Sequence, residues 1–405
     1  MKSKWITATI DDVCTVVTDG AHNSPKSVEE GHYMASVKDF TEFGFDFSNC
    51  KQIGKEDYEK LRNQGCVPEK NDILVGKDGA RYFEDIIIYK QDERPALLSS
   101  IAILRADSRK ITPEFLYYTL KSPAVRKDVR ENYGSGSAIP RIVLKDFKRM
   151  PFSFPSIEEQ RKITNLCSAI DAKIQVNNAI NENLEQQVQT LFADWLSANS
   201  ESATEIALGN ICTKVTDGSH FSPKDDSTSS IPMLSVKDMR EFDFDLTSCK
   251  HICEDDYEKM VANDCVPQVN DILVAKDGSY LKEIFICNEK RKLAILSSIA
   301  IFRPNTTVIH PEILLAFLKS PRVLQEVRDN YVSGSALPRI VLKDFKKLTF
   351  SLPDMDAQNL IAPLFASIRE QIAVNVAENK YMTQLRDTLL PKLMSGELNV
   401  DNIHL

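Results

Sequence analysis

The chain repeats itself once, and this duplication constrains its fold more than any other feature of the sequence. Shifting the 405 residues by 198 or 199 positions aligns most of the chain with itself. VTDGAHNSPK, which begins at Val17, returns as VTDGSHFSPK from Val215, and residues 134–148 match residues 332–346 at 13 of 15 positions. Solenoid repeats span only ~20–50 residues, so this much longer period indicates two similar domains rather than a solenoid.

Each copy changes character once along its length. Residues 1–155 alternate short apolar runs that are typical of β-strands, such as DILV from Asp72, with turn residues and helical stretches, which predicts an α+β globule. The turn residues then disappear, and Ser156 with Glu159 forms a capping-box pattern for a long helix. We therefore expect domains at 1–155 and 201–353, each followed by a helical segment, at 156–200 and 354–405.

The two predicted helices carry a heptad pattern that favours an antiparallel coiled coil between them. The expected seam positions are Ile170, Ile174, Asn177, Asn181 and Leu184 in the first helix, and Ile368, Ile372, Asn375, Asn379 and Met382 in the second. Antiparallel pairing places Asn177 opposite Asn379 and Asn181 opposite Asn375, around Ala179 and Ala377, with pseudo-two-fold symmetry, and such polar seam residues fix the register. The alternative is two independent helices, each packed on its own globule. Pro363 predicts a kink or a late start in the second helix.

Composition limits the classes of function. With 42% hydrophobic and 27% charged residues the chain is an ordinary globular protein. Its longest apolar runs are about eight residues, shorter than the roughly 20 of a membrane-spanning helix. No secretory signal is evident, so a cytoplasmic protein with nine reduced cysteines is expected. A net charge of −8 argues against a protein that coats nucleic acid through bulk positive charge.

Recognisable catalytic motifs are missing from the sequence. There is no Walker motif and no Asn-Pro-Pro-aromatic motif, GSGSAI from Gly134 lacks the third glycine of a dinucleotide loop, and Cys249 with Cys253 has no second cysteine pair for zinc. Asp72, Lys77 and Asp78 return as Asp271, Lys276 and Asp277 and resemble a nuclease cluster, although a strand bounded by turns explains them more simply. We expect no catalytic residue and no metal site.

Positive charge is concentrated in one equivalent segment of each copy. Residues 121–149 hold eight Lys or Arg against three acids, and residues 319–347 hold seven against three. A solvated basic face is the alternative, but basic residues beside a Ser/Gly loop suit DNA phosphates. The predicted contacts in these segments are Ser137, Arg141, Lys145 and Lys148, and Ser335, Arg339, Lys343 and Lys346. Loops that suit base edges add His22, Lys38, Lys77, His220, Lys237 and Lys276.

Several motifs together resemble the specificity subunit of type I restriction-modification enzymes. They are NDILVGKDG with NDILVAKDG, the TLFADWL end of the first helix, and LRDTLLPKLMSGEL at residues 385–398. The resemblance covers nearly the full chain, and it departs from the pattern at Ala357, where the first copy has Glu159, and at Pro363.

The resemblance implies a subunit without chemistry of its own that reads a bipartite, near-palindromic target on double-stranded DNA. Each globule would be a target recognition domain, and the helices would set the spacing. Modification subunits, two in number, would bring S-adenosylmethionine, and restriction subunits would bring ATP and Mg2+. A duplicated coiled-coil adaptor that binds only proteins, or a stand-alone restriction enzyme, are the alternatives.

Overall fold

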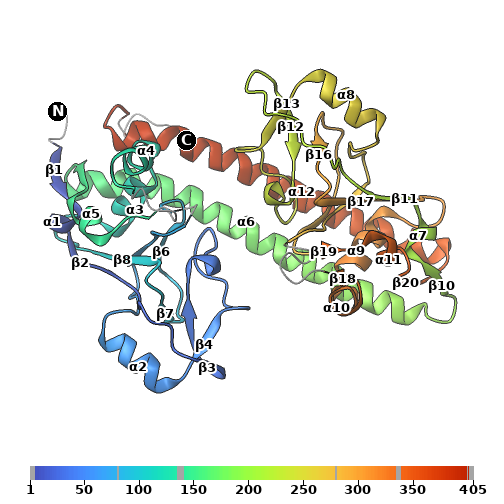
Figure 1. The fold of residues 1–405 in the computed structure, drawn as a ribbon, viewed down its shortest axis with the longest axis horizontal. Coiled ribbons are helices and arrows are strands. Elements are labelled where there is room, and N and C mark those ends of the chain that lie inside the picture. The colour runs from blue at the N-terminus through green and yellow to red at the C-terminus, as the bar shows by residue number, and fades with distance from the viewer. Residues whose placement is uncertain are drawn as a thin grey trace. The chain divides into compact units, whose positions relative to one another are not determined.

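The computed structural model describes residues 5–79, 82–134, 141–278, 281–333, 339–398 and 400 (Figure 1). The chain forms two compact units: residues Met1–Gln175 with Lys380–Leu405, and residues Val176–Asn379. Each unit therefore combines one copy of the globule with a part of both long helices, whereas the predicted domain boundaries followed the chain.

The first unit is an α+β globule, as predicted. Its strands are β1 (Ile6–Thr9), β2 (Cys14–Asp19), β3 (Ser27–Ala35), β4 (Lys51–Ile53), β5 (Ile73–Gly76), β6 (Ile86–Ile88), β7 (Ala96–Leu97), β8 (Ile101–Ala106) and β9 (Pro151–Phe154). Its helices are α1 (Ile10–Val13), α2 (Lys55–Asn63), α3 (Pro113–Lys121), α4 (Pro123–Asn132) and α5 (Leu144–Arg149), with a 3-10 turn η1 (Val37–Asp39).

The main sheet of this unit is antiparallel, in the order β2-β8-β5-β6. Strand β5 is buried along its whole length, which explains its continuous apolar run. A second sheet has the order β4-β3-β7. Helices α3 and α4 are separate because Pro123 restricts Ser122 to an extended conformation, at φ −63° and ψ 140°. Ser122 then caps α4 by accepting a hydrogen bond from the Val125 amide.

The second unit repeats this architecture. Its main sheet has the order β11-β17-β14-β15, and its second sheet the order β13-β12-β16. The strands are β10 (Thr204–Ala207), β11 (Cys212–Asp217), β12 (Ile231–Leu234), β13 (Lys250–Ile252), β14 (Ile272–Ala275), β15 (Ile284–Ile286), β16 (Ala294–Ile295), β17 (Ile299–Pro304), β18 (Val332–Ser333), β19 (Arg339–Ile340) and β20 (Thr349–Leu352). The helices are α7 (Leu208–Ile211), α8 (Glu254–Ala262), α9 (Pro311–Lys319), α10 (Pro321–Asn330) and α11 (Leu342–Phe345), with a 3-10 turn η2 (Val236–Asp238).

The long helices are α6 (Ile157–Ala198) and α12 (Met355–Met394), drawn in green and red in Figure 1. Ser156 begins α6, since its Oγ accepts a hydrogen bond from the Glu159 amide. The predicted late start of α12 is wrong. Asp354 caps this helix by accepting a hydrogen bond from the Ala357 amide at 2.9 Å. The helix is continuous through Pro363, and the side chain of Pro363 is exposed.

The seam between the two helices is antiparallel, as the heptad pattern predicted. Asn177 donates to Asn379 at 2.9 Å, and Asn375 donates to Asn181 at 2.7 Å, so α12 steps back by four residues as α6 advances by four. Two independent helices do not form such bonds. Ile170, Ile174, Asn177, Asn181, Ile372 and Asn375 are buried, and Leu184, Ile368, Asn379 and Met382 are partly buried. Ala179 and Ala377 are exposed, outside the seam.

Helix α12 meets the length and hydropathy criteria of a membrane-spanning helix, with a mean hydropathy of 1.2 over an 18-residue window. The sequence argument considered only uninterrupted apolar runs, and it did not predict that α12 would meet these criteria. The buried side of α12 carries polar groups with polar partners: Asn375 bonds to Asn181, and Gln358 donates to the carbonyl of Pro353. Ala362 and Phe365 belong to the core of the second unit.

Candidate nucleic-acid interface

Four loop segments meet where β2 and β5 end and β8 begins, and they form the candidate interface of the first unit. They are the TDGAH loop (18–22), the SVKD turn (36–39), the KDG turn (77–79) and the LSS turn (98–100). Backbone bonds from the LSS turn join them: the Leu98 amide donates to Ala35, the Ser99 amide donates to Ala21, and Ser100 accepts from the Lys77 amide, all at 2.8–2.9 Å. The frame is therefore built from backbone groups.

The second unit repeats this frame bond for bond. The Leu296 amide donates to Leu234, the Ser297 amide donates to Ser219, and Ser298 accepts from Lys276, at 2.8–2.9 Å. The sequence signal for the LSS turn was the repeated LSSIAI segment. Its connecting role was missed because the partners of these amides are far away in sequence.

One glycine in each copy makes the frame possible. A Cβ atom at Gly20 would lie 2.2 Å from the carbonyl oxygen of Leu97, and one at Gly218 would lie 2.3 Å from that of Ile295. No side chain fits such a close backbone approach. This is the physical reason for the glycine in both TDG motifs.

A buried ion pair ties the TDGAH loop to the KDG turn. Lys77 is 7% exposed, and its Nζ lies 3.2 Å from Asp19; Lys276 is 8% exposed and lies 2.8 Å from Asp217. Burial and an acidic partner leave neither ammonium group free at the surface, and contact of Lys77 and Lys276 with DNA stays a prediction.

The histidines in these loops also contact the aspartates. The Nε2 atoms of His22 and His220 lie 3.4 and 3.3 Å from Asp19 and Asp217, while their side chains remain more than three-quarters exposed. Asp19 and Asp217 therefore organise the loops, and the sequence reasoning did not single them out. The repetition of the TDG motif in both copies is the sequence feature that could have identified these two aspartates.

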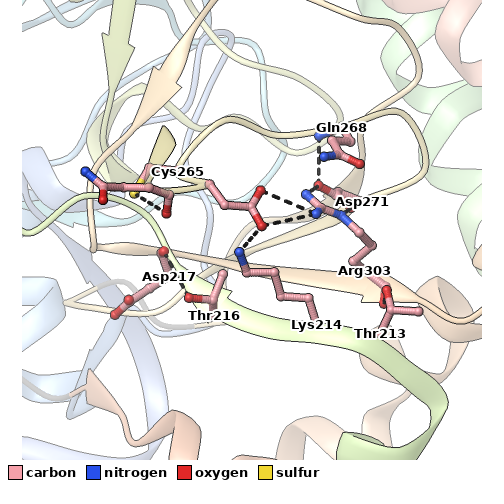
Figure 2. A network of polar contacts seen from close by, with 10 residues as sticks. Thr213, Lys214, Thr216, Asp217, Cys265, Gln268, Asp271 and Arg303 are labelled. Carbon is pink, nitrogen blue, oxygen red and sulfur yellow. Dashed lines mark hydrogen bonds and ion pairs between the residues drawn. The ribbon is translucent and has the colours of Figure 1, made fainter. Parts of the chain in front are cut away.

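Of the residues that resembled a nuclease cluster, Asp72 and Asp271 are each held by an arginine, while Lys77 lies 3.9 Å from Asp78 and Lys276 lies 3.6 Å from Asp277. Arg303 holds the fully buried Asp271 through two bonds of 2.8 Å. The Gln268 amide also donates to Asp271, at 2.7 Å, and Figure 2 marks this bond with a dashed line. The bond to Asp271 raises the pKa of Arg303. Arg105 and Asp72 form the same bidentate pair in the first unit, at 2.8 and 2.9 Å. These aspartates stabilise the entry to β5 and β14.

The basic segment of each copy docks on the KDG turn. The Ile142 amide donates to the Lys77 carbonyl, and the Ile340 amide donates to that of Lys276, both at 3.0 Å. Buried Ile142 and Phe147 anchor the segment in the first unit. The structure thus brings the predicted segments together.

Apart from the two buried lysines, the predicted Lys and Arg residues have exposed side chains. Exposed side chains are those of Lys38, Arg141, Lys145, Lys148, Lys237, Arg339, Lys343 and Lys346. Lys148 also lies 3.2 Å from Asp11. Ser137 and Ser335 lie outside the described residues. Contact of these side chains with DNA stays a prediction.

The family model that describes the type I restriction modification DNA specificity domain matches the chain twice, over residues 2–186 and 201–381. The chain belongs to this family of DNA specificity domains, and it carries two of them.

Named relatives agree with this assignment. The type I restriction enzyme MjaIX specificity subunit of Methanocaldococcus jannaschii is 25% identical over 323 residues, covering 72% of this chain and 71% of that protein. The HindI specificity subunit of Haemophilus influenzae is 21% identical over 399 residues, covering 82% and 87%. A crystal structure of an S subunit from M. genitalium covers 96% of both chains at 18% identity, with a TM-score of 0.45.

Proposed function

We propose that this chain is the DNA-reading subunit of a type I restriction-modification complex and carries no catalytic residue of its own. The observation that supports this most strongly is the repeated loop frame. Both units use the same backbone bonds, the same glycine and the same buried Asp–Lys pair to hold exposed cations beside loops of short polar side chains. Phosphate contacts from exposed Lys and Arg would position the loops, and loop side chains would read base edges.

Partner subunits supply the chemistry in this proposal. Two modification subunits would bring S-adenosylmethionine, and restriction subunits would bring ATP and Mg2+, so that the complex acts in the cytoplasm on double-stranded DNA. An adaptor that binds only proteins would have no need of two similar clusters of exposed cations around polar loops. The acidic net charge of the chain suits a subunit whose partners complete the positive surface around DNA.

The target in this proposal is a near-palindrome with an unread spacer. The loops TDGAHNSPK and TDGSHFSPK differ at two positions, Ala21 against Ser219 and Asn23 against Phe221, and the SVKD and KDG motifs are identical. Similar loops read similar half-sites, and the antiparallel seam of α6 and α12 favours an inverted repeat over a direct one.

The deciding experiment is to sequence methylated sites in DNA from cells that express the chain with its modification partner. We expect adenine methylation in two half-sites that are inverted copies or differ at one or two bases. Unrelated half-sites would contradict the argument from loop similarity, and a direct repeat would contradict the antiparallel argument. The chain without partners is the control, and it is expected to transfer no methyl group and to cut no DNA.

A further inference from the structure

A basic pocket in the first unit lies beside the candidate interface and is not part of the loop frame. It has a volume of about 440 Å³ and is bounded by α3, α4 and the C-terminal part of α12. Its charged lining consists of Lys121, Arg126, Lys127, Arg130 and Arg386 against Glu131 and Asp387. Five cationic side chains thus face two acidic ones, and the pocket is suited to an anion.

Three of the five cations already have acidic partners. Arg386 lies 2.6 Å from Asp171, Arg130 lies 2.5 Å from Glu84, and Lys127 lies 3.9 Å from Glu131. These pairs account for much of the positive charge. They leave Lys121 and Arg126 to be explained.

Lys121 and Arg126 form no ion pair with any residue in the described part of the chain. The Lys121 ammonium donates to the Tyr117 hydroxyl at 2.9 Å and lies 5.0 Å from the centre of its ring. Arg126 donates to the Glu84 carbonyl at 3.0 Å, but its Nε is buried without a partner. Burial and the neighbouring Arg386 lower the pKa of Lys121 to about 8, and burial lowers that of Arg126. An anion in the pocket would compensate both groups.

The second copy does not repeat this group of cations. Lys121 returns as Lys319, whose ammonium is 2.8 Å from Glu185 and stacks on Phe242. Arg126 and Lys127 return as Leu324 and Gln325, and Arg386 corresponds to Val188. The second unit therefore neutralises its lysine internally, and the first unit does not.

Two arginines of the pocket bond to a residue that follows the KDG turn of the same unit. Arg126 and Arg130 both bond to Glu84, which follows the KDG turn, and α4 belongs to the basic segment whose Ile142 amide docks on that turn. A ligand seated on Arg126 would therefore lie close to the loop frame. The anion that a DNA-reading surface meets there is a backbone phosphate, which Arg and Lys recognise by charge-assisted hydrogen bonds.

We propose that this pocket binds a backbone phosphate at the flank of the half-site read by the first unit, and that the second unit has no equivalent contact. The proposal rests on the proposed DNA-reading function. It predicts that the two half-sites are held unequally, because one end of the target has an additional phosphate contact.

The test compares the wild-type chain with Arg126→Leu/Lys127→Gln, which places the residues of the second copy in α4. Each protein is assembled with its modification partner, and its affinity for a duplex with the methylated sequence is measured over a range of salt concentrations. The slope of log affinity against log salt should fall by about one to two units. Affinity at fixed salt should fall by about tenfold. Arg322→Ala, which removes an exposed arginine from α10, is the matched control and should change neither quantity by as much.

Single methylphosphonate substitutions in the duplex locate the contact. One neutralised phosphate beside the first half-site should weaken wild-type binding and leave the double variant unaffected, with no counterpart at the second half-site. A titration with inorganic phosphate, compared with chloride at equal ionic strength, tests whether the pocket binds a free anion instead of a DNA phosphate.

An unchanged salt slope in the double variant would overturn the proposal. Loss of the modification partner at an unchanged slope would overturn it as well, since the pocket would then bind a protein carboxylate. Specific competition by inorganic phosphate with no sensitive methylphosphonate position would contradict the DNA assignment. Failure of the proposed function is distinct from these outcomes, because the wild-type chain would then direct no site-specific methylation at all.

Discussion

The two units share the frame that holds their loops and differ where the long helices meet the globules. Asp19–Lys77 and Asp217–Lys276 are equivalent buried pairs. In contrast, Asp171 of α6 pairs with Arg386 of α12 in the first unit, while the residue equivalent to Asp171 in the second is Arg369, which pairs with Glu312 at 2.8 Å. The charge at one position of the repeat is thus reversed.

Acidic groups are also distributed differently. Around Lys319 the second unit has Glu185, Glu241 and Glu283, and burial raises the pKa of Glu241 and of Glu283. The corresponding region of the first unit has a surplus of cations. The two copies therefore keep the same loop frame, which backbone hydrogen bonds define. The ion pairs between the long helices and the globules differ, because both residues of a pair are replaced in the other copy.

The largest expected effect comes from breaking the buried pair that only the first unit has. Asp171→Ala leaves Arg386, which is 6% exposed, without its closest carboxylate, and removes the acceptor of the Tyr118 hydroxyl. We expect the free energy of unfolding of the first unit to fall by about 3–5 kcal/mol. Urea-dependent hydrogen exchange of the α3 amides measures it.

The control for this prediction replaces Arg386 by the uncharged residue that the other copy has at the equivalent position. Asp171→Ala/Arg386→Val introduces the valine found at position 188 and should recover part of the loss, because no unpaired charge stays buried. A double variant as unstable as the sum of the two single variants would contradict a specific interaction between these residues.

The second-largest expected effect comes from breaking the buried Asp–Lys pair in the loop frame that the two units share. Asp19→Asn leaves the buried Lys77 without its nearest carboxylate, and Asp217→Asn does the same to Lys276. Each change should destabilise its own loops by about 2–3 kcal/mol. Sequencing of methylated sites should then show relaxed recognition of one half-site in each variant, and of a different half-site in the two. Loss of both half-sites in either single variant would break the equivalence of the units.

The third prediction concerns how the stability contribution of Lys121, the equivalent of Lys319, depends on pH. Its pKa is lowered to about 8 from 10.5, and the side chains around it are those of Tyr117, Asp171, Arg386, Glu42 and Arg126. Lys121 holds more protons in the unfolded chain between these two values, so its own contribution to the free energy of unfolding should rise by about 1–3 kcal/mol as pH increases from 8 to 10.5. Burial raises the pKa of Tyr117 and of the Cys167 thiol, and these groups contribute in the opposite direction, so the Lys121 contribution is the difference between the wild type and Lys121→Met.

Chemical unfolding of both proteins across this pH range is the measurement, and the stability of the wild type relative to Lys121→Met should increase with pH. DNA affinity should change in the opposite direction, since loss of the ammonium charge weakens a phosphate contact. A stability difference between the two proteins that does not change with pH would contradict the lowered pKa of Lys121.

The smallest effect concerns the loops themselves. Asn23 and Phe221 occupy equivalent positions in the TDGAH and TDGSH loops, and Phe221 is 62% exposed. Asn23→Phe or Phe221→Asn should change base preference at one position of one half-site by about 1–2 kcal/mol. Methylation of a randomised target library measures it, and stability should stay unchanged. An unaltered preference in both variants would place the difference between half-sites elsewhere.

Sequence alone determined the features that depend on local pattern. The duplication, the α+β class, the buried strand DILV and the long helices follow from residue periodicity, and the heptad seam even predicted which asparagines meet. Such patterns are read within one segment. The seam was readable because two regular helices can align only in a few registers.

Tertiary structure decided the roles of charged residues. Nothing in the sequence marks Lys77 or Arg386 as buried, yet both are buried and paired with Asp19 and Asp171. Their partners lie 58 and 215 positions away in the chain, and no local pattern connects them. Whether a charge is buried, paired or free depends on which distant segments pack against it, because Coulomb and desolvation energies depend on distance in space rather than along the chain.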